Sequence, residues 1–124
     1  MSWKGALKLK NTQTIVDIEK ASSILKLMGD KTRLSMLKLL QQNECSVCEF
    51  VSIFNISQSA VSQHLRKLKD VGLVKENRKG QWIFYSLNKN HEAYEFVQNL
   101  LDFIPDQDQK IKELEQQGLR ITCD

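Results

Sequence analysis

Residues 57–69 read Ser-Gln-Ser-Ala-Val-Ser-Gln-His-Leu-Arg-Lys-Leu-Lys. Serine is a preferred helix N-cap, and Val61, Leu65 and Leu68 recur at steps of three and four residues. This spacing predicts a helix that begins after Ser57, ends near Asp70 and buries one apolar face. The remaining side chains form a polar outer face, which consists of Gln58, Ser59, Ser62, Gln63 and Lys67, with His64 at its flank.

A shorter helix is predicted immediately before this one. Residues 46–49, Ser-Val-Cys-Glu, have the spacing of a capping box, in which the serine hydroxyl and the glutamate side chain each satisfy an amide at the helix start. We expect this helix to run to about Phe54 and to be followed by a break at Asn55 and Ile56. Two helices joined by such a turn are typical of a helix-turn-helix, whose second helix enters the major groove of DNA.

A β-hairpin is predicted after the second helix. Residues 73–77 and 81–87 have the pattern of strands, because the second is rich in aromatic and β-branched residues, and residues 78–80 supply a turn that contains glycine. Such a hairpin is called a wing. Arg78 and Lys79 at its tip could reach DNA phosphates or the adjacent minor groove.

Helices are also predicted on both sides of this core. The fold class is therefore mainly α with a small β-hairpin, a winged helix-turn-helix. The first helix covers residues 14–28, with Ile15, Ile18, Leu25 and Met28 on one face and Gly29 as its stop. The second helix covers residues 31–42, is capped by Asp30 and has Leu34, Leu37 and Leu40 in the core. Two further helices are predicted after the hairpin, over residues 90–103, where Pro105 marks the end, and over residues 107–117.

Length and charge restrict the class of protein. A chain of 124 residues with 41% hydrophobic content suits one domain. The net charge is only +3, but residues 58–80 hold six basic and two acidic side chains. The N-terminus has no apolar run of signal-peptide or membrane-spanning length, so we expect a cytoplasmic protein with no membrane partner. We find no Ser-His-Asp set, phosphate-binding glycine loop or paired-carboxylate cleft in the sequence, which argues against an enzyme.

The polar outer face is the evidence for DNA. Glutamine amides can pair with adenine, serine hydroxyls can contact base edges or phosphates, and Lys67 suits a phosphate. On an isolated helix such a face would most simply be solvated surface, but the order of elements and the basic wing favour double-stranded DNA. A winged helix that binds a protein partner instead is the alternative, and salt-sensitive retention on duplex DNA would separate the two.

Four segments in order resemble the ArsR/SmtB (arsenic-repressor) family of winged helix-turn-helix transcriptional repressors. They are residues 27–33 (Leu-Met-Gly-Asp-Lys-Thr-Arg), 44–50 (Glu-Cys-Ser-Val-Cys-Glu-Phe), 57–65 and 80–87 (Gly-Gln-Trp-Ile-Phe-Tyr-Ser-Leu). The resemblance covers about residues 24–87. It implies a homodimer joined through the N-terminal helix and the helix after the wing, which binds a palindromic operator and releases it when an inducer binds. Residues 1–105 would form the DNA-binding and dimerisation domain, and residues 106–124 a helical tail.

The cysteines indicate what the inducer could be. The family motif Glu-Leu-Cys-Val-Cys-Asp-Leu carries thiolates for soft metals and metalloids. Aligned on Val47, this chain keeps the second thiol as Cys48, replaces the first by Ser46, and has Cys45 at an apolar position of the motif. The resemblance implies a repressor that needs no cofactor to bind DNA and is released by arsenite or antimonite at Cys45 and Cys48. Cys123 is the candidate third ligand.

Other inducers remain open on the same residues. Thiols near a helix start tend to ionise, and a Cys-x-x-Cys pair there also suits dithiol exchange, so a peroxide- or sulfur-responsive repressor is an alternative. A divalent soft metal is less favoured. Family members that sense zinc use acidic and histidine ligands on the helix after the wing, where this chain offers His91 alone at a matching place.

Overall fold

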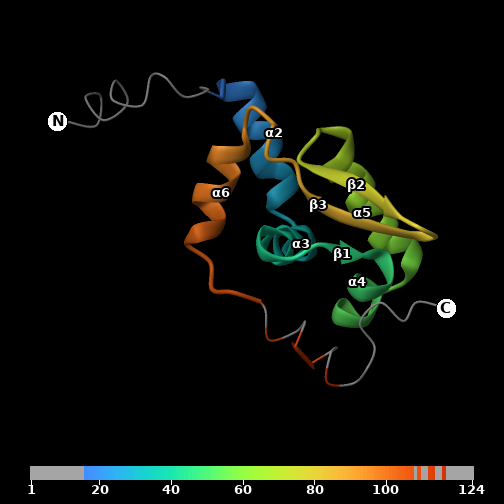
Figure 1. Cartoon of the computed structure of the whole chain (residues 1–124). Coiled ribbons are helices and arrows are strands. Elements are labelled where there is room, and N and C mark those ends of the chain that lie inside the picture. The colour runs from blue at the N-terminus through green and yellow to red at the C-terminus, as the bar shows by residue number, and fades with distance from the viewer. Residues whose placement is uncertain (1–15, 108, 110–111, 114–115, 117–124) are drawn as a thin grey trace.

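The computed structural model describes residues 16–107, 109, 112–113 and 116. Figure 1 shows α3 near the centre, with α6 on one side of it and the sheet, α4 and α5 on the other. The prediction of a mainly helical winged helix-turn-helix with a small β-hairpin is confirmed, and a third short strand joins the hairpin. The elements are α2 (Ile18–Met28), α3 (Lys31–Gln42), β1 (Cys45–Ser46), α4 (Val47–Phe54), α5 (Gln58–Asp70), β2 (Val74–Lys79), β3 (Trp82–Leu87) and α6 (Tyr94–Asp102).

The central helix α3 contributes several side chains to the core. It begins where predicted, because an oxygen of the Asp30 side chain accepts a hydrogen bond from the Arg33 amide at 3.0 Å. Met36, Leu37 and Leu39 are fully buried. Each such side chain contributes about 1.5–3 kcal/mol to folding through the apolar surface it removes from water.

The helix-turn-helix consists of α4 and α5. The capping box is present: the Ser46 amide donates to Glu49 Oε1 at 2.8 Å, and the Glu49 amide donates to Ser46 Oγ at 3.3 Å. Asn55 ends α4 in a left-handed conformation with φ 52°. This geometry suits asparagine better than most residues, because its short polar side chain tolerates positive φ.

The second helix, α5, starts after its predicted cap. The Ser57 hydroxyl accepts from the Ala60 amide at 3.0 Å, and Val61, Leu65 and Leu68 are buried as predicted. The helix is therefore held by one apolar face, and its opposite face is left to solvent.

The sheet has the order β1-β3-β2 and is antiparallel throughout. Lys79 pairs with Trp82, so the turn is Gly80-Gln81 rather than residues 78–80, and the first strand runs two residues further than predicted. Gly80 has φ +62°, which a two-residue hairpin turn commonly requires. The short strand β1 was not predicted; it pairs Cys45 with Tyr85 and Ser46 with Phe84.

The first described helix, α2, differs from its prediction in two ways. Gly29 ends it in a right-handed conformation with φ −70°, so the left-handed glycine turn that often stops a helix is not used. Ile18 and Leu25 are 82% and 48% exposed, whereas Met28 is buried. Of the apolar face predicted to be buried, Met28 is buried, whereas Ile18 and Leu25 are exposed to solvent. Residues 14 and 15 of the predicted helix lie outside the described residues.

The segment before α6 is hydrogen-bonded to the end of α5, and α6 begins at Tyr94, later than predicted. His91 Nε2 donates to the Val71 carbonyl at 2.8 Å, and its Nδ1 accepts from the Ala93 amide at 2.9 Å. Gly72 has φ +83°, and a β-carbon at this position would lie 2.9 Å from the His91 ring. Chain segments nearly twenty residues apart are thus in close contact here.

The helix α6 packs on α3. Val97 and Leu101 are buried as one face of α6. The buried Lys38 amino group donates to the Leu101 carbonyl at 3.0 Å, near the end of the helix. The helix predicted over residues 107–117 falls largely outside the described residues. Among the residues that are described, no helix is both long and apolar enough to cross a membrane.

Candidate DNA interface

The outer face of α5 carries the predicted contact residues together. Gln58, Ser59, Ser62, Gln63 and Lys67 are all exposed, and His64 is half-buried at the flank. Their common orientation follows from the burial of the three apolar positions on the other side of the same helix. The polar groups are therefore presented as one surface, with amide and hydroxyl groups toward the helix start and the Lys67 ammonium further along.

The half-buried His64 has a partner that sequence reasoning missed. Arg33 Nη1 lies 3.1 Å from His64 Nδ1, and Arg33 Nε donates to the Leu27 carbonyl at 2.8 Å. A hydrogen bond from the Arg33 amide, and then the charge of its guanidinium, lower the pKa of Asp30 below its ordinary value. The start of α3, the end of α2 and α5 thus meet at Arg33.

A groove of about 530 Å³ separates α5 from the wing. Lys69 on one side forms a salt bridge at 2.6 Å with Glu76 on the other, which lowers the pKa of the Glu76 carboxyl. Arg66 also lines this groove, is exposed, and makes no salt bridge within the described part of the chain. Arg66 was not among the predicted contacts, although its place one turn after Ser62 is a signal that could have found it.

The two basic residues of the wing differ in their surroundings. Lys79 Nζ lies 2.5 Å from Glu44 Oε1 and 5.2 Å from the centre of the Phe84 ring. Arg78 is exposed and forms no salt bridge within the described residues. Arg78 is therefore the better placed of the two to meet a phosphate, and contact by Lys79 would require it to leave Glu44.

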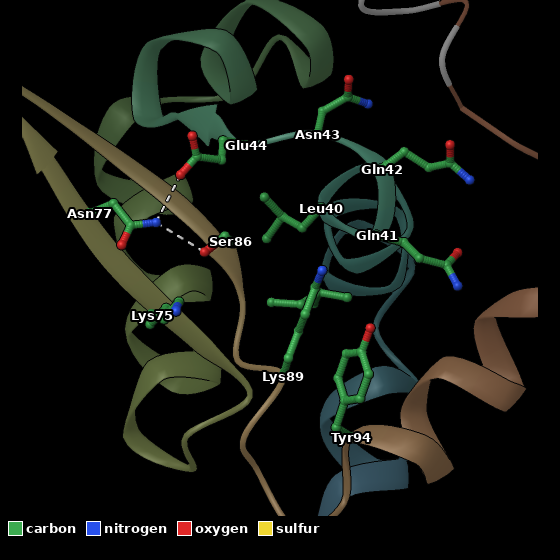
Figure 2. Close-up of a pocket in the computed structure, with 11 residues that line it drawn as sticks. Leu40, Gln41, Gln42, Asn43, Glu44, Lys75, Asn77, Ser86, Lys89 and Tyr94 are labelled. Atoms are coloured by element: carbon green, nitrogen blue, oxygen red, sulfur yellow. Dashed lines mark hydrogen bonds between the residues drawn. The ribbon is translucent and has the colours of Figure 1, made fainter.

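Glu44 connects the wing to the chain before α4. The Asn77 side-chain amide donates to Glu44 Oε2 at 2.8 Å and to Ser86 Oγ at 3.0 Å, as Figure 2 shows. The hydrogen bond from Lys79, followed by that from Asn77, lowers the pKa of the Glu44 carboxyl. These contacts border a hollow of about 390 Å³ between the end of α3, the sheet and the start of α6 (Figure 2).

Comparison with known proteins identifies the family. The model of the bacterial regulatory protein arsR family matches residues 30–76. An arsenical resistance operon repressor from Staphylococcus xylosus is 36% identical over 88 residues, which cover 71% of this chain and 83% of the relative. The chain belongs to the arsR family. A helix-turn-helix transcriptional regulator from Methanocaldococcus jannaschii is 44% identical over 68 residues, which cover 54% of this chain and 76% of the relative.

Solved structures agree with this family. The transcriptional repressor BigR from Xylella fastidiosa has a TM-score of 0.62 at 29% identity, over 69% of this chain and 84% of that one. HlyU from Vibrio cholerae has a TM-score of 0.59 at 38% identity, over 68% of this chain and 90% of that one. This member of the arsR family is therefore a winged-helix DNA-binding transcription regulator and not an enzyme.

The cysteines of this arsR-family chain lie in unlike environments. Cys45 is 0% exposed in β1. Cys48 is half-buried at the second position of α4 and is disulfide-bonded in the structure. Cys123 lies outside the described residues. Among the residues that the structure covers, no three His, Cys, Asp or Glu side chains are grouped so as to hold a metal ion. The predicted metal ligands therefore remain a prediction.

Proposed function

We propose that the protein is a cytoplasmic transcriptional repressor that binds double-stranded operator DNA as a homodimer. The observation that carries the proposal is the outer face of α5, where uncharged polar side chains, Arg66 and Lys67 are exposed, while Arg78 is exposed on the wing. Glutamine and serine can pair with base edges, while the cations can meet phosphates. Several curated relatives have names that describe repressors, including those of arsenical resistance operons.

The homodimer is supported by apolar side chains that a monomer leaves in water. Ile18 and Leu25 are exposed on α2, and Phe103 directly after α6 is 89% exposed. Both helices belong to the part of the fold on which the resemblance places the dimer interface. A dimer would present two copies of α5 to half-sites about one helical turn of DNA apart, roughly 34 Å. Phe103→Asp should shift the protein toward monomer in analytical ultracentrifugation.

The DNA step is tested with a duplex selected by the protein from a random-sequence pool and with its scrambled counterpart. Lys67→Ala should weaken binding to both duplexes and lower the slope of log affinity against log salt by about 1. Gln58→Ala should lose about 1–3 kcal/mol on the selected duplex and much less on the scrambled one. Equal losses for Gln58→Ala would refute base reading, and salt-independent capture of a protein without duplex binding would favour an interaction module.

Arsenite or antimonite is the proposed inducer. Cys48 stands at the start of α4, where the helix dipole favours a thiolate once the disulfide is reduced, and Cys45 lies three residues before it. These two thiols, with Cys123 as the third, would supply the sulfur ligands that such metalloids take. The names of relatives from arsenical resistance operons support this choice.

The environment of Cys45 suggests how an inducer could reach the DNA surface. Because Cys45 is fully buried in β1, its thiol must become exposed before an inducer can bind it, and separation of β1 from β3 is the movement we propose. That separation would also withdraw the neighbouring Glu44 from Asn77 and Lys79 on the wing. Capture of the inducer would thus displace the wing as well as α4. A coupling of about 1–3 kcal/mol would change DNA affinity roughly 5–150-fold.

Titration of the reduced protein on its selected duplex tests the inducer. Arsenite or antimonite should release the wild type, whereas Cys48→Ser should bind the duplex normally and remain bound at the same inducer concentration. Ser52→Ala, a change at an exposed position of α4, should behave as the wild type does. Loss of DNA binding by Cys48→Ser would mean that this thiol is structural. Release by zinc alone would reject the metalloid.

Cys48 is disulfide-bonded, although not to Cys45, and this favours a second candidate, a repressor of the same fold that responds to oxidation of the Cys48 thiol. Two thiols and one hydrogen peroxide give a disulfide and two waters, so peroxide alone would suffice as the oxidant. In the same titration, release by peroxide that dithiothreitol reverses, with no release by arsenite, would establish this candidate in place of the first.

A further inference from the structure

We propose that His64 donates a hydrogen bond from Nε2–H to a DNA phosphate, and that Arg33 is the positioning residue that holds the imidazole in the required tautomer and orientation. The inference rests on the proposed DNA-binding function and deepens it. It assigns a defined chemical role to a flank residue of α5 and brings α3 into the interface through Arg33.

The tautomer follows from the donor inventory of the two side chains. A guanidinium carries only donors and stays protonated in proteins, so Arg33 Nη1 can interact favourably with His64 Nδ1 only by donating to it. Nδ1 must then hold a lone pair, which leaves the proton of the neutral ring on Nε2. The distance of 3.1 Å between Nη1 and Nδ1 is within the ordinary range for such a bond.

Arg33 is itself fixed, so it can orient the ring. Its Nε donates to the Leu27 carbonyl at 2.8 Å while its Nη1 reaches His64, which uses two donors of the rigid fork at once. Its backbone amide is held by the Asp30 cap at 3.0 Å. A lysine could preserve the charge but has no second donor in fixed geometry, so it cannot make both contacts in the same way.

The opposite edge of the ring is available for DNA. His64 is half-buried, next to the exposed Gln63 on the flank of the outer face of α5. Within the described residues, His64 Nε2 makes no hydrogen bond of its own. A phosphate oxygen is the acceptor we assign, because phosphates line the edges of the groove that the outer face would enter and the nearby Arg33 charge favours an anion.

Nuclear magnetic resonance of the DNA-free protein tests the positioning step. At pH 8, well above the ordinary histidine pKa of about 6.5, long-range proton–nitrogen spectra should show His64 wholly as the Nε2–H form. Arg33→Lys and Arg33→Met should give a mixture of the two tautomers. His91, the second histidine of the chain, is held by backbone groups and should keep its Nε2–H form in every variant. A protonated Nδ1 in the wild type, or no change in the variants, would overturn the role of Arg33.

Binding of two isosteric variants tests the donor step. Glutamine places its terminal amide near the position of Nε2, and asparagine places its amide near that of Nδ1. His64→Asn should therefore bind both the selected and the scrambled duplex about 10-fold more weakly, the loss expected for one charge-assisted hydrogen bond. His64→Gln should stay within about 3-fold of the wild type, since it can still donate to the phosphate.

The outcomes separate this inference from the proposed function. If His64→Asn binds as the wild type does, or if its loss is confined to the selected duplex, the phosphate contact is wrong while the DNA-binding function stands. A wild type that binds neither duplex overturns the proposed function and with it the contact, whereas the tautomer measurement still decides the role of Arg33. Thermal unfolding of the Arg33 variants identifies any that lose the fold, and the two His64 variants remain informative in that case.

Discussion

The two helices of the helix-turn-helix, α4 and α5, begin with the same kind of cap but differ in burial. Both start after a serine whose hydroxyl accepts from an amide three residues later. In α4 the cap is buried, its glutamate partner is fully buried, and Phe50 packs on Phe54 with ring centres 6.0 Å apart. In α5 the cap is exposed, and so is most of the polar face that follows.

Within residues 47–70, the more buried helix α4 therefore serves mainly the stability of the fold, and the more exposed helix α5 serves DNA recognition. Substitutions in α4 should change the free energy of unfolding, because they disturb buried polar and aromatic contacts. Substitutions on the outer face of α5 should change DNA binding and leave the fold nearly intact, because solvent already surrounds them.

The largest effect is expected at Phe50. Phe50→Ala removes a fully buried ring and should lower the free energy of unfolding by about 3–5 kcal/mol, measured by urea denaturation. Gln63→Ala on the exposed face of α5 should stay within about 0.5 kcal/mol of the wild type. A loss of several kcal/mol for Gln63→Ala would show that the outer face of α5 supports the fold, and the contrast between the helices would fail.

The two serine caps give a smaller and better matched comparison. Ser46→Ala should cost about 1–2 kcal/mol, because the buried Glu49 amide loses its acceptor. Ser57→Ala should cost about 0.5–1 kcal/mol, because water can replace the hydroxyl at an exposed cap. Thermal unfolding of both variants in one buffer measures the difference, and equal costs would mean that burial of the α4 cap adds nothing.

The smallest effect is expected at Glu44, which joins the segment before α4 to the wing. Since its pKa is lowered in the folded protein, ionised Glu44 stabilises the fold fully above its unfolded value of about 4.3, and this contribution is lost as the pH falls through the folded pKa. Because Lys79 is 58% exposed, Glu44→Gln should cost only about 0.5 kcal/mol at pH 7.

A pH series completes that test. The difference in unfolding free energy between wild type and Glu44→Gln should shrink as the pH falls through the lowered pKa of Glu44, because the wild-type carboxyl then becomes protonated as well. Asp102→Asn, at an exposed acidic position of α6, serves as a control for general loss of negative charge. A difference that stays unchanged as the pH falls until the wild type itself unfolds would assign the effect to packing rather than to the Lys79 pair.

The parts of the fold that were predictable from sequence depend on neighbours along the chain. Asp30, Ser46 and Ser57 each cap a helix through contacts three residues away, and apolar spacing shows which face of α5 is buried. The short strand β1 could not be predicted, because two residues carry no periodicity and their partners lie about forty residues later in β3. The outward faces of α2 also escaped prediction, since spacing marks an apolar face without saying what covers it.

In the candidate interface too, features set by neighbours along the chain were predictable, and features set by distant contacts were not. The outer face of α5 followed from helical spacing, whereas the surroundings of its members depend on contacts between distant segments. Arg33 and His64 are 31 residues apart, and Glu44 and Lys79 are 35 apart. Nothing in the local pattern distinguishes Lys79, which is paired with Glu44, from Arg78, which is exposed beside it.

The contact of His91 with Val71 and Gly72 affects how the two α5 helices of a dimer would be oriented and spaced on DNA. The imidazole lies close to Gly72, accepts from the Ala93 amide just before α6 and donates to the Val71 carbonyl, so His91 links the end of α5 to the start of α6. In a dimer joined through α6, contacts with the partner subunit would then influence the tilt of α5 through His91. The distance between the two α5 helices of such a dimer would then depend on the contacts between its subunits.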